Sequence, residues 1–137
     1  VRERRAGFPV YVPAKLTSQS RYAAPDNGAP VGPRIYTVRD RAGRPHRAYR
    51  LVITQNPTLG EYYGVQGTTW LTPPILAHPD AVTRIDGRTL KLFKSGGRLR
   101  LVAWRKGRAV YWVSNDLSLS LSNGQMLGIA ASLTRAR

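Results

Sequence analysis

The sequence predicts an α+β domain in which a mostly antiparallel sheet of about five to seven strands, built from hairpins, carries one carboxyl-terminal helix on one face. Three observations predict this class. Short runs rich in β-branched and aromatic residues recur over residues 34–113, with tight turns between them. Near residue 122 the apolar period changes to that of a helix. With 137 residues and 42% hydrophobic content, the chain suits one buried core.

The amino-terminal residues 1–33 are predicted to be irregular, and residues 34–137 are predicted to form the domain. Residues 25–33 hold three prolines together with Asn27-Gly28 and Gly32. These residues interrupt both strands and helices. Before them, residues 8–12 form a short β-rich run, and we expect one brief strand there.

The first hairpin is expected from Arg34–Asp40 and His46–Thr54, two β-rich runs joined by a glycine-containing loop. Alternate residues of the second run are apolar, so one face of that strand should be buried. The next segment, residues 56–74, has neither the period of a strand nor that of a helix. We expect it to be a partly extended strand or an ordered loop that closes against the sheet.

Asp86-Gly87 predicts a second hairpin, because both central positions of a type I′ turn need a positive φ. Lys106-Gly107 predicts a third. In the strand before it, Leu99, Leu101 and Ala103 are expected on one face, with Val102 and Trp104 on the other. Apolar residues on both faces are typical of a central strand that is covered on two sides.

A helix of about twelve residues should follow, because Ser122 and Gln125 have the spacing of a capping box. The residues that repeat at i, i+3, i+4 and i+7 and form its apolar stripe are Met126, Ile129, Ala130 and Leu133. Arg135 and Arg137 are expected near its carboxyl end, where the helix dipole favours cations. Trp104 and Trp112 are expected to pack between the sheet and this helix.

The charge is strongly positive: 22 basic and 7 acidic residues give +15. Such a field attracts polyanions, including nucleic acid, anionic lipid and phosphate-bearing glycopolymer. Arginine outnumbers lysine 18 to four, and guanidinium groups hold phosphate and carboxylate at two points. A GC-rich genome would give the same arginine excess without any ligand.

Basic residues gather in two clusters. One surrounds the first predicted hairpin loop, and the other lies on and around the third hairpin. The residues of the two clusters are Arg39, Arg41, Arg44, Arg47 and Arg50, and Arg98, Arg100, Arg105, Lys106 and Arg108. From them we predict anion contacts by Arg41, Arg44, Arg47, Arg98, Arg100 and Arg105. The alternative is a solvated sheet face that keeps an edge soluble.

Three aromatic residues, Tyr62, Tyr63 and Trp70, lie close together in the unusual segment GEYYGVQGTTW. Aromatic rings of this kind stack on sugars or bases. We therefore include the three in the predicted ligand-binding site. The alternative is that they pack a loop onto the core.

Catalytic constellations are missing from the sequence. It has no cysteine, and several acids occupy turn positions where short carboxylates usually bind local backbone. His46 and His78 are 32 residues apart, without a companion at ligand spacing. We therefore predict no catalytic residue, no metal site and no cofactor, and hence that the domain is not an enzyme.

Three segments resemble the region carboxyl-terminal to the catalytic domain of actinobacterial LytR-CpsA-Psr proteins: residues 48–70, 104–117 and 121–133. The resemblance covers about residues 33–133, and GEYYGVQGTTW is its most specific piece. The family implies extracytoplasmic transfer of lipid-linked, phosphate-bearing glycopolymers onto peptidoglycan. The arginine and aspartate cluster with which the family's catalytic domain binds pyrophosphate and Mg²⁺ has no match here, so no catalytic residue is carried over.

The resulting hypothesis is a non-catalytic, extracytoplasmic accessory domain, held at the membrane or cell wall through its parent protein. It would bind an anionic cell-wall polymer or a lipid phosphate near an attached transferase domain. We expect no transmembrane segment in this chain, since its apolar runs are only a few residues long. The alternatives are a basic nucleic-acid-binding domain and a structural protein-interaction domain.

Overall fold

The computed structural model describes residues 6–13, 21–22, 33–56 and 61–136. Its main sheet has eight strands, all paired antiparallel, in the order β2-β4-β5-β9-β8-β7-β6, with β3 also paired to β4. A second sheet joins β1 (Tyr11–Val12) to β10 (Thr134–Arg135). The strands of the main sheet are β2 (Arg21–Tyr22), β3 (Arg34–Arg39), β4 (Pro45–Asn56), β5 (Glu61–Thr68), β6 (Ala81–Ile85), β7 (Arg88–Ser95), β8 (Arg98–Lys106) and β9 (Ala109–Asn115).

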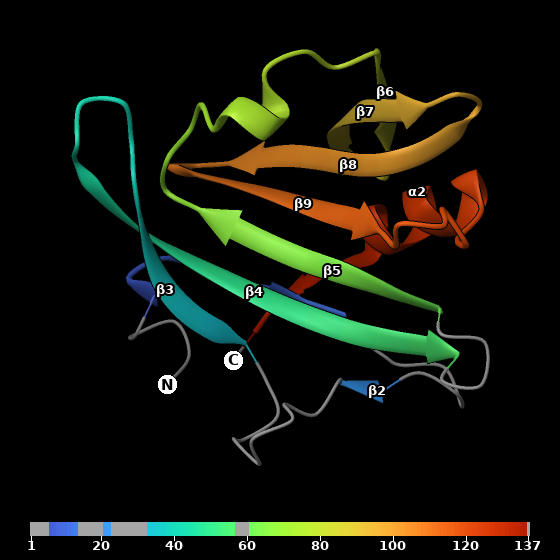
Figure 1. Ribbon diagram of the computed structural model, residues 1–137, viewed down its shortest axis with the longest axis horizontal. Coiled ribbons are helices and arrows are strands. Elements are labelled where there is room, and N and C mark those ends of the chain that lie inside the picture. Colours follow the sequence, from blue (N-terminus) through green and yellow to red (C-terminus); the bar gives the residue numbers. More distant parts are fainter. Residues whose placement is uncertain (1–5, 14–20, 23–32, 57–60, 137) are drawn as a thin grey trace.

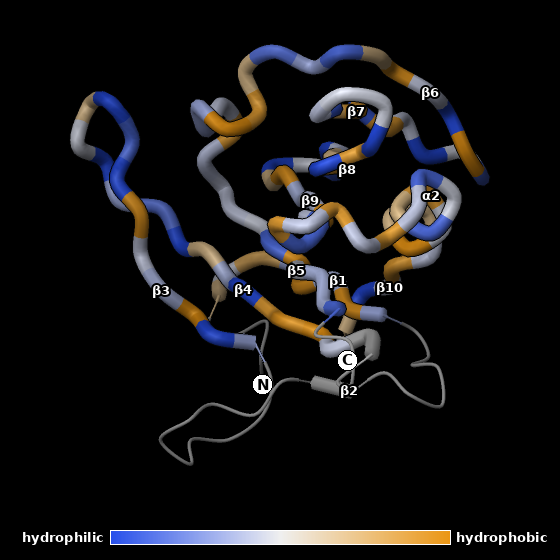
Figure 2. Tube along the Cα trace, turned by 45° about the vertical axis from the view of Figure 1, so that its right-hand side comes forward, coloured by the Kyte–Doolittle hydropathy of each residue, from blue (hydrophilic) through white to orange (hydrophobic). Residues whose placement is uncertain are grey.

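One α-helix, α2 (Asn123–Ser132), lies near the carboxyl end and contacts β7, β8 and β9. The antiparallel sheet with a single carboxyl-terminal helix confirms the coarse fold prediction, with one strand more than the upper estimate when the two-residue β2 is counted. Figure 2 shows the neighbouring strands β4, β5, β9 and β8 as an arc, with α2, β1 and β10 on its inner side. The predicted amino-terminal loop covers residues 25–33, and residues 25–32 of it lie outside the described residues.

The three predicted hairpins are present, although the turn of the third lies one residue later than the predicted Lys106-Gly107. Asp86 and Gly87 have φ values of 51° and 79°, the pair of positive angles that a type I′ turn needs. At the third hairpin Lys106 pairs with Ala109, so the two loop residues are Gly107 and Arg108. Gly107 has a φ of 61°, which a glycine adopts without steric cost.

Segment 56–74 contains a full strand. Strand β5 lies between β4 and β9, and both neighbours pair with it over most of its length (Figure 1). Gly67 allows this close packing, because a Cβ there would lie 2.5 Å from Tyr49 Cε1 and 2.7 Å from Tyr111 Cδ1. The strand is followed by a loop and the short 3₁₀ helix η1 (Pro74–Leu76).

A β-bulge changes the predicted faces of β8. Phe93 pairs with Leu101 and Lys94 pairs with Leu99, so Arg100 is the extra residue. As a result, Leu99 joins the core on the helix side with Val102 and Trp104, whereas Leu101 and Ala103 lie in the cluster on the other face. The prediction that Leu99 shares a face with Leu101 and Ala103 is therefore wrong, although both faces are covered as expected.

The larger core lies between the sheet and α2, and it includes Tyr49, Tyr111, Met126 and Ala130. The smaller cluster lies on the outer face, where Leu71 and Leu76 pack on it. Trp104 belongs to the larger core, as predicted. The prediction for Trp112 is wrong, because strand alternation on β9 places it in the outer cluster.

Helix α2 begins with the predicted capping box. Ser122 Oγ accepts a hydrogen bond from Gln125 N, and the Gln125 side chain accepts one from Ser122 N. The other end differs from the prediction, because Arg135 lies in strand β10. In its place Arg88 donates to the carbonyls of Ala130 and Leu133, at 2.6 Å and 3.1 Å.

Candidate functional site

A groove of about 730 Å³ lies between the β3–β4 turn and the chain that follows β5. We call it the Trp70 groove. It combines two cations, an aromatic ring, an imidazole–carboxylate pair and an apolar wall. Its lining residues are Asp40, Arg41, Ala42, His46, Thr69, Trp70, Leu71, Thr72, Pro73, Pro74, Leu76, Ala77 and Lys91.

Asp40 shapes the β3–β4 turn that forms one side of this groove. Its Oδ1 accepts hydrogen bonds from Ala42 N and Arg44 N, both at 2.9 Å. Gly43 closes the turn with a φ of 79°, and Arg39 Nη1 donates to its carbonyl at 2.9 Å. Aspartate is favoured at such positions because its short side chain reaches the backbone N–H groups ahead of it. The local sequence therefore holds this turn, and Arg41 on it, in one shape.

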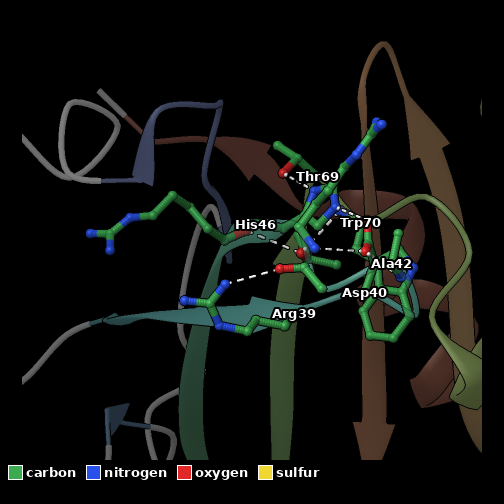
Figure 3. A network of polar contacts seen from close by, with 10 residues as sticks. Arg39, Asp40, Ala42, His46, Thr69 and Trp70 are labelled. Carbon is green, nitrogen blue, oxygen red and sulfur yellow. Dashed lines mark hydrogen bonds and ion pairs between the residues drawn. The ribbon is translucent and has the colours of Figure 1, made fainter.

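His46 connects this turn to the end of β5. Its Nε2 lies 2.8 Å from Asp40 Oδ2, and its Nδ1 lies 3.1 Å from Thr69 Oγ1 (Figure 3). Asp40 and His46 keep only 18% and 22% of their side-chain surface exposed. The hydrogen bond from His46, aided by those from Arg44 and Ala42, lowers the pKa of Asp40. The carboxylate is thus held ionised beside the imidazole, and the network fixes the mouth of the groove.

Trp70 is placed by a buried hydroxyl. Thr68 Oγ1 donates to the Arg47 carbonyl at 3.1 Å and accepts from Trp70 N at 3.2 Å. Trp70 itself is half-buried, so part of its ring surface is available on the groove. Lys91 reaches the same groove from β7 and is exposed. Segments that are far apart in the sequence therefore bring one indole and two cationic side chains together.

Two of the nine predicted ligand residues, Arg41 and Trp70, line this groove. Arg44 is exposed on the turn beside Arg41. Arg47 is exposed and donates to Thr37 Oγ1 at 3.1 Å. Four members of the first basic cluster therefore lie at or near the β3–β4 turn, whereas Arg50 pairs with Arg34 at the other end of β3.

The residues of the second basic cluster are spread along β8, so the members at its two ends lie far apart. Arg98 lies at one end, where its Nη2 donates to the carbonyls of Leu119 and Leu121 at 2.7 Å and 2.9 Å. Arg105 lies seven residues further along an extended strand, about 23 Å away. Arg100 in the bulge is 5.6 Å from the centre of the Phe93 ring. These three arginines therefore do not form a single site.

Tyr62 and Tyr63 point to opposite faces of the sheet, because successive side chains of a strand alternate. Tyr63 is 4% exposed and belongs to the larger core, so core packing is the correct interpretation for it. Tyr62 is 36% exposed near the start of β5. Trp70 follows the other end of that strand, so it does not form a joint platform with the tyrosines.

Sequence reasoning missed His46, Thr69 and Lys91 as parts of a site. Asp40 and His46 flank one hairpin loop, so their proximity is readable from the predicted turn. Thr69 is 23 residues beyond His46, and Lys91 comes from another hairpin. No local pattern identifies those two, because their position depends on how β5 and β7 are placed in the sheet.

The carboxylates of the described residues mostly satisfy backbone donors. Asp80 Oδ2 accepts from Lys94 N at 2.7 Å, and Asp116 Oδ1 accepts from Ser120 N at 2.9 Å. Asp40 Oδ2 differs from these two, because it lies 2.8 Å from the side-chain Nε2 of His46. Arg41, Arg44 and Lys91 are exposed, so positive charge faces the solvent around the groove.

Comparisons of the chain with protein-family models, curated proteins and solved structures give no match. Within the part of the chain that the structure describes, no three His, Cys, Asp or Glu side chains gather as a metal-ligand group. The described helices are too short or too polar to cross a bilayer. The Trp70 groove is therefore the feature of this domain that bears most directly on its function.

Proposed function

We propose that this domain is a binding module for an anionic glycopolymer, and that the polymer lies in the Trp70 groove. The observation that carries the proposal is the meeting of Trp70 with Arg41 and Lys91 along one open groove. An indole face packs on the apolar side of a sugar ring, while cations beside it attract phosphate or carboxylate groups. A saccharide chain that carries such groups presents both features together.

The two cations would act differently. Arg41 presents a planar guanidinium that can hold two oxygens of one phosphate, whereas Lys91 acts as a compact point charge. The Asp40–His46–Thr69 network would position Arg41 by holding the turn on which it lies. The resemblance to LytR-CpsA-Psr accessory regions supports an extracytoplasmic, non-catalytic role beside a transferase. A lipid-linked phosphate would use the same cations.

Calorimetric titration of the purified protein with wall teichoic acid, which carries phosphate in each repeat, tests the proposal. We expect binding at about 50 mM salt that weakens markedly by about 200 mM. Neutral dextran should not bind, because it lacks the anionic groups. Absence of binding to wall teichoic acid at the lower salt concentration would overturn the proposal.

Variants separate groove binding from general attraction to a basic surface. R41Q is expected to lower polymer affinity about tenfold, since it removes one charge-assisted contact. R34Q is the matched control, because Arg34 is exposed at the opposite end of β3. Equal losses in R41Q and R34Q would contradict a localised site.

A single-stranded nucleic acid is the second candidate ligand, because Trp70 beside exposed cations also resembles a base-stacking platform. Competition distinguishes the two. If oligonucleotides bind through Trp70 and displace the glycopolymer at much lower concentrations, nucleic acid is the better assignment. If they bind weakly and equally in wild type and W70A, the glycopolymer assignment stands.

A further inference from the structure

A second hollow, of about 290 Å³, lies beside the β8–β9 turn. We call it the β8–β9 hollow. Its cations are Lys106, Arg108 and Arg135, and its apolar wall includes Phe8, Pro9 and Tyr11. The sequence-based clusters include Lys106 and Arg108 but not Arg135, which is distant in the chain.

The turn and the two small strands position these side chains. Lys106 pairs with Ala109 at the base of the turn, which leaves Arg108 in the two-residue loop. Arg135 pairs with Tyr11 between β1 and β10. The wall is anchored to the core, because Tyr111 Oη donates to Pro9 O at 2.6 Å and Tyr49 Oη donates to Tyr11 O at 2.9 Å. The hollow is therefore built on hydrogen-bonded backbone.

Thr69 lines both the β8–β9 hollow and the Trp70 groove, so the two adjoin at this residue. A third hollow, of about 390 Å³, shares Tyr11 and Lys106 with the second and adds Arg88 and Arg105. Positive charge thus continues past the groove along one end of the sheet, where the β3–β4 and β8–β9 turns lie (Figure 1).

Few acids of the described residues lie at this end of the sheet. Asp40 and Asp86 are the carboxylates at this end, and Asp40 is held by His46 and its own turn. Glu61 starts β5, Asp80 precedes β6 and Asp116 follows β9, all toward the opposite end of their strands. The charge distribution is therefore uneven along the strands.

We propose that the β8–β9 hollow is a second anion subsite, and that the ligand carries anionic groups in successive repeats of one chain. This inference rests on the proposed function and narrows its substrate class. A polymer with charge in each repeat can occupy the groove and the hollow together across Thr69. A ligand with a single phosphate group fills only one of them.

The test compares binding of wall teichoic acid fragments with one repeat and with several repeats. For wild type, we expect affinity to rise at least about tenfold with repeat number, because the second contact becomes intramolecular. The double variant K106Q/R108Q should lose most of this gain and bind the single-repeat fragment nearly as wild type does. R34Q/K94Q is the matched control, since it removes two exposed cations at the other end of the strands; it should keep the gain.

Three results would overturn the second subsite. One is wild-type affinity that does not rise with repeat number, which leaves single-site binding in the groove intact. Another is an equal gain in K106Q/R108Q and wild type. The last is failure of every fragment and of the intact polymer to bind, which removes the proposed function as well. Circular dichroism and the melting temperature check that each variant is folded.

Discussion

Trp70 depends on its neighbour for its orientation. Thr68 is 2% exposed, and its hydroxyl donates a hydrogen bond to the Arg47 carbonyl and accepts one from the Trp70 amide. A buried hydroxyl that donates and accepts in this way is costly to rearrange. The indole is thus presented to the groove by backbone that cannot shift easily, which favours binding because little ordering remains to be done.

W70A should therefore reduce glycopolymer affinity without unfolding the protein. Stacking on an aromatic face is worth about 1–3 kcal/mol where it has been measured for bases, so we expect a loss of about tenfold or more. W70F retains an aromatic face and should recover part of the affinity. Calorimetric titration of the three proteins checks this, and unchanged affinity in W70A would remove Trp70 from the site.

Asp40 should make the stability of the protein depend on pH. Its pKa is lowered by His46 first and by the Arg44 amide next, so it binds protons less readily folded than unfolded. Its contribution to the free energy of unfolding is therefore present above about pH 4 and is lost as the pH falls through its folded pKa. D40N should be less stable than wild type at neutral pH, with the difference shrinking in acid. Urea unfolding at several pH values measures this; a difference that does not vary with pH would contradict it.

At the scale of elements, the close approach of β4, β5 and β9 depends on one glycine. A methyl group on Gly67 would meet Tyr49 and Tyr111, which are both fully buried. Tyr49 is also bonded through its hydroxyl to Tyr11 N and O, at 3.0 Å and 2.9 Å. The rings therefore have little room to move.

G67A should destabilise the protein by about 1–3 kcal/mol through overpacking. G128A is the matched control, because a Cβ at this helical position would meet no atom within 4 Å. It should stabilise the protein by about 0.5–1 kcal/mol, since alanine favours the helix over glycine. Thermal and urea unfolding of both variants provide the measurement. Equal effects in the two variants would contradict the packing argument.

Arg88 joins the sheet to the end of α2. Its guanidinium donates to the carbonyls of Ala130 and Leu133 and lies 4.6 Å from the centre of the Trp104 ring. Burial lowers the pKa of this guanidinium from its usual value. The cation that satisfies the helix end thus comes from a strand more than forty residues earlier.

R88M should cost about 1–3 kcal/mol of stability, because it keeps the apolar stem but leaves two carbonyls without their donor. R84M is the control, since Arg84 is exposed on the edge strand β6. The free energy of unfolding from urea titration distinguishes the two. A loss in R84M as large as that in R88M would show that charge alone is responsible.

At the level of the whole molecule, the net charge is +15, and the described carboxylates mostly accept hydrogen bonds from backbone N–H groups. Positive charge therefore remains at the surface, and among the described residues several exposed cations lie around the β3–β4 and β8–β9 turns. Long-range attraction should bring polyanions to this end of the sheet, and the local contacts of the groove should then hold them.

The logarithm of the binding constant for the polymer should consequently fall linearly with the logarithm of the salt concentration. Removing one contacting cation, as in R41Q, should reduce the slope by about one. R34Q should leave the slope nearly unchanged, because Arg34 lies away from the groove. Titrations of the three proteins at four or more salt concentrations, written as log Kd against log salt, measure the slopes. A wild-type slope near zero would contradict an electrostatic binding mode.

Local sequence is enough to specify those features that depend on neighbouring residues in the chain. Asp86-Gly87 specifies its turn, Ser122 and Gln125 specify the start of α2, and alternating residues specify most strands. The charge and the cluster around the β3–β4 turn are likewise local. Each is decided by backbone angles and hydrogen bonds that span only a few residues.

Contacts between residues that are distant in the chain depend instead on how the strands are arranged. The bulge at Arg100 moved Leu99 to the other face, and the length of β8 separated Arg98 from Arg105. Thr69 contacts His46, and Lys91 lines the same groove as Trp70, because β5 and β7 occupy particular places in a curved sheet. The physical reason is that strand order, register and curvature depend on the packing of the whole core, which no short stretch of the chain encodes.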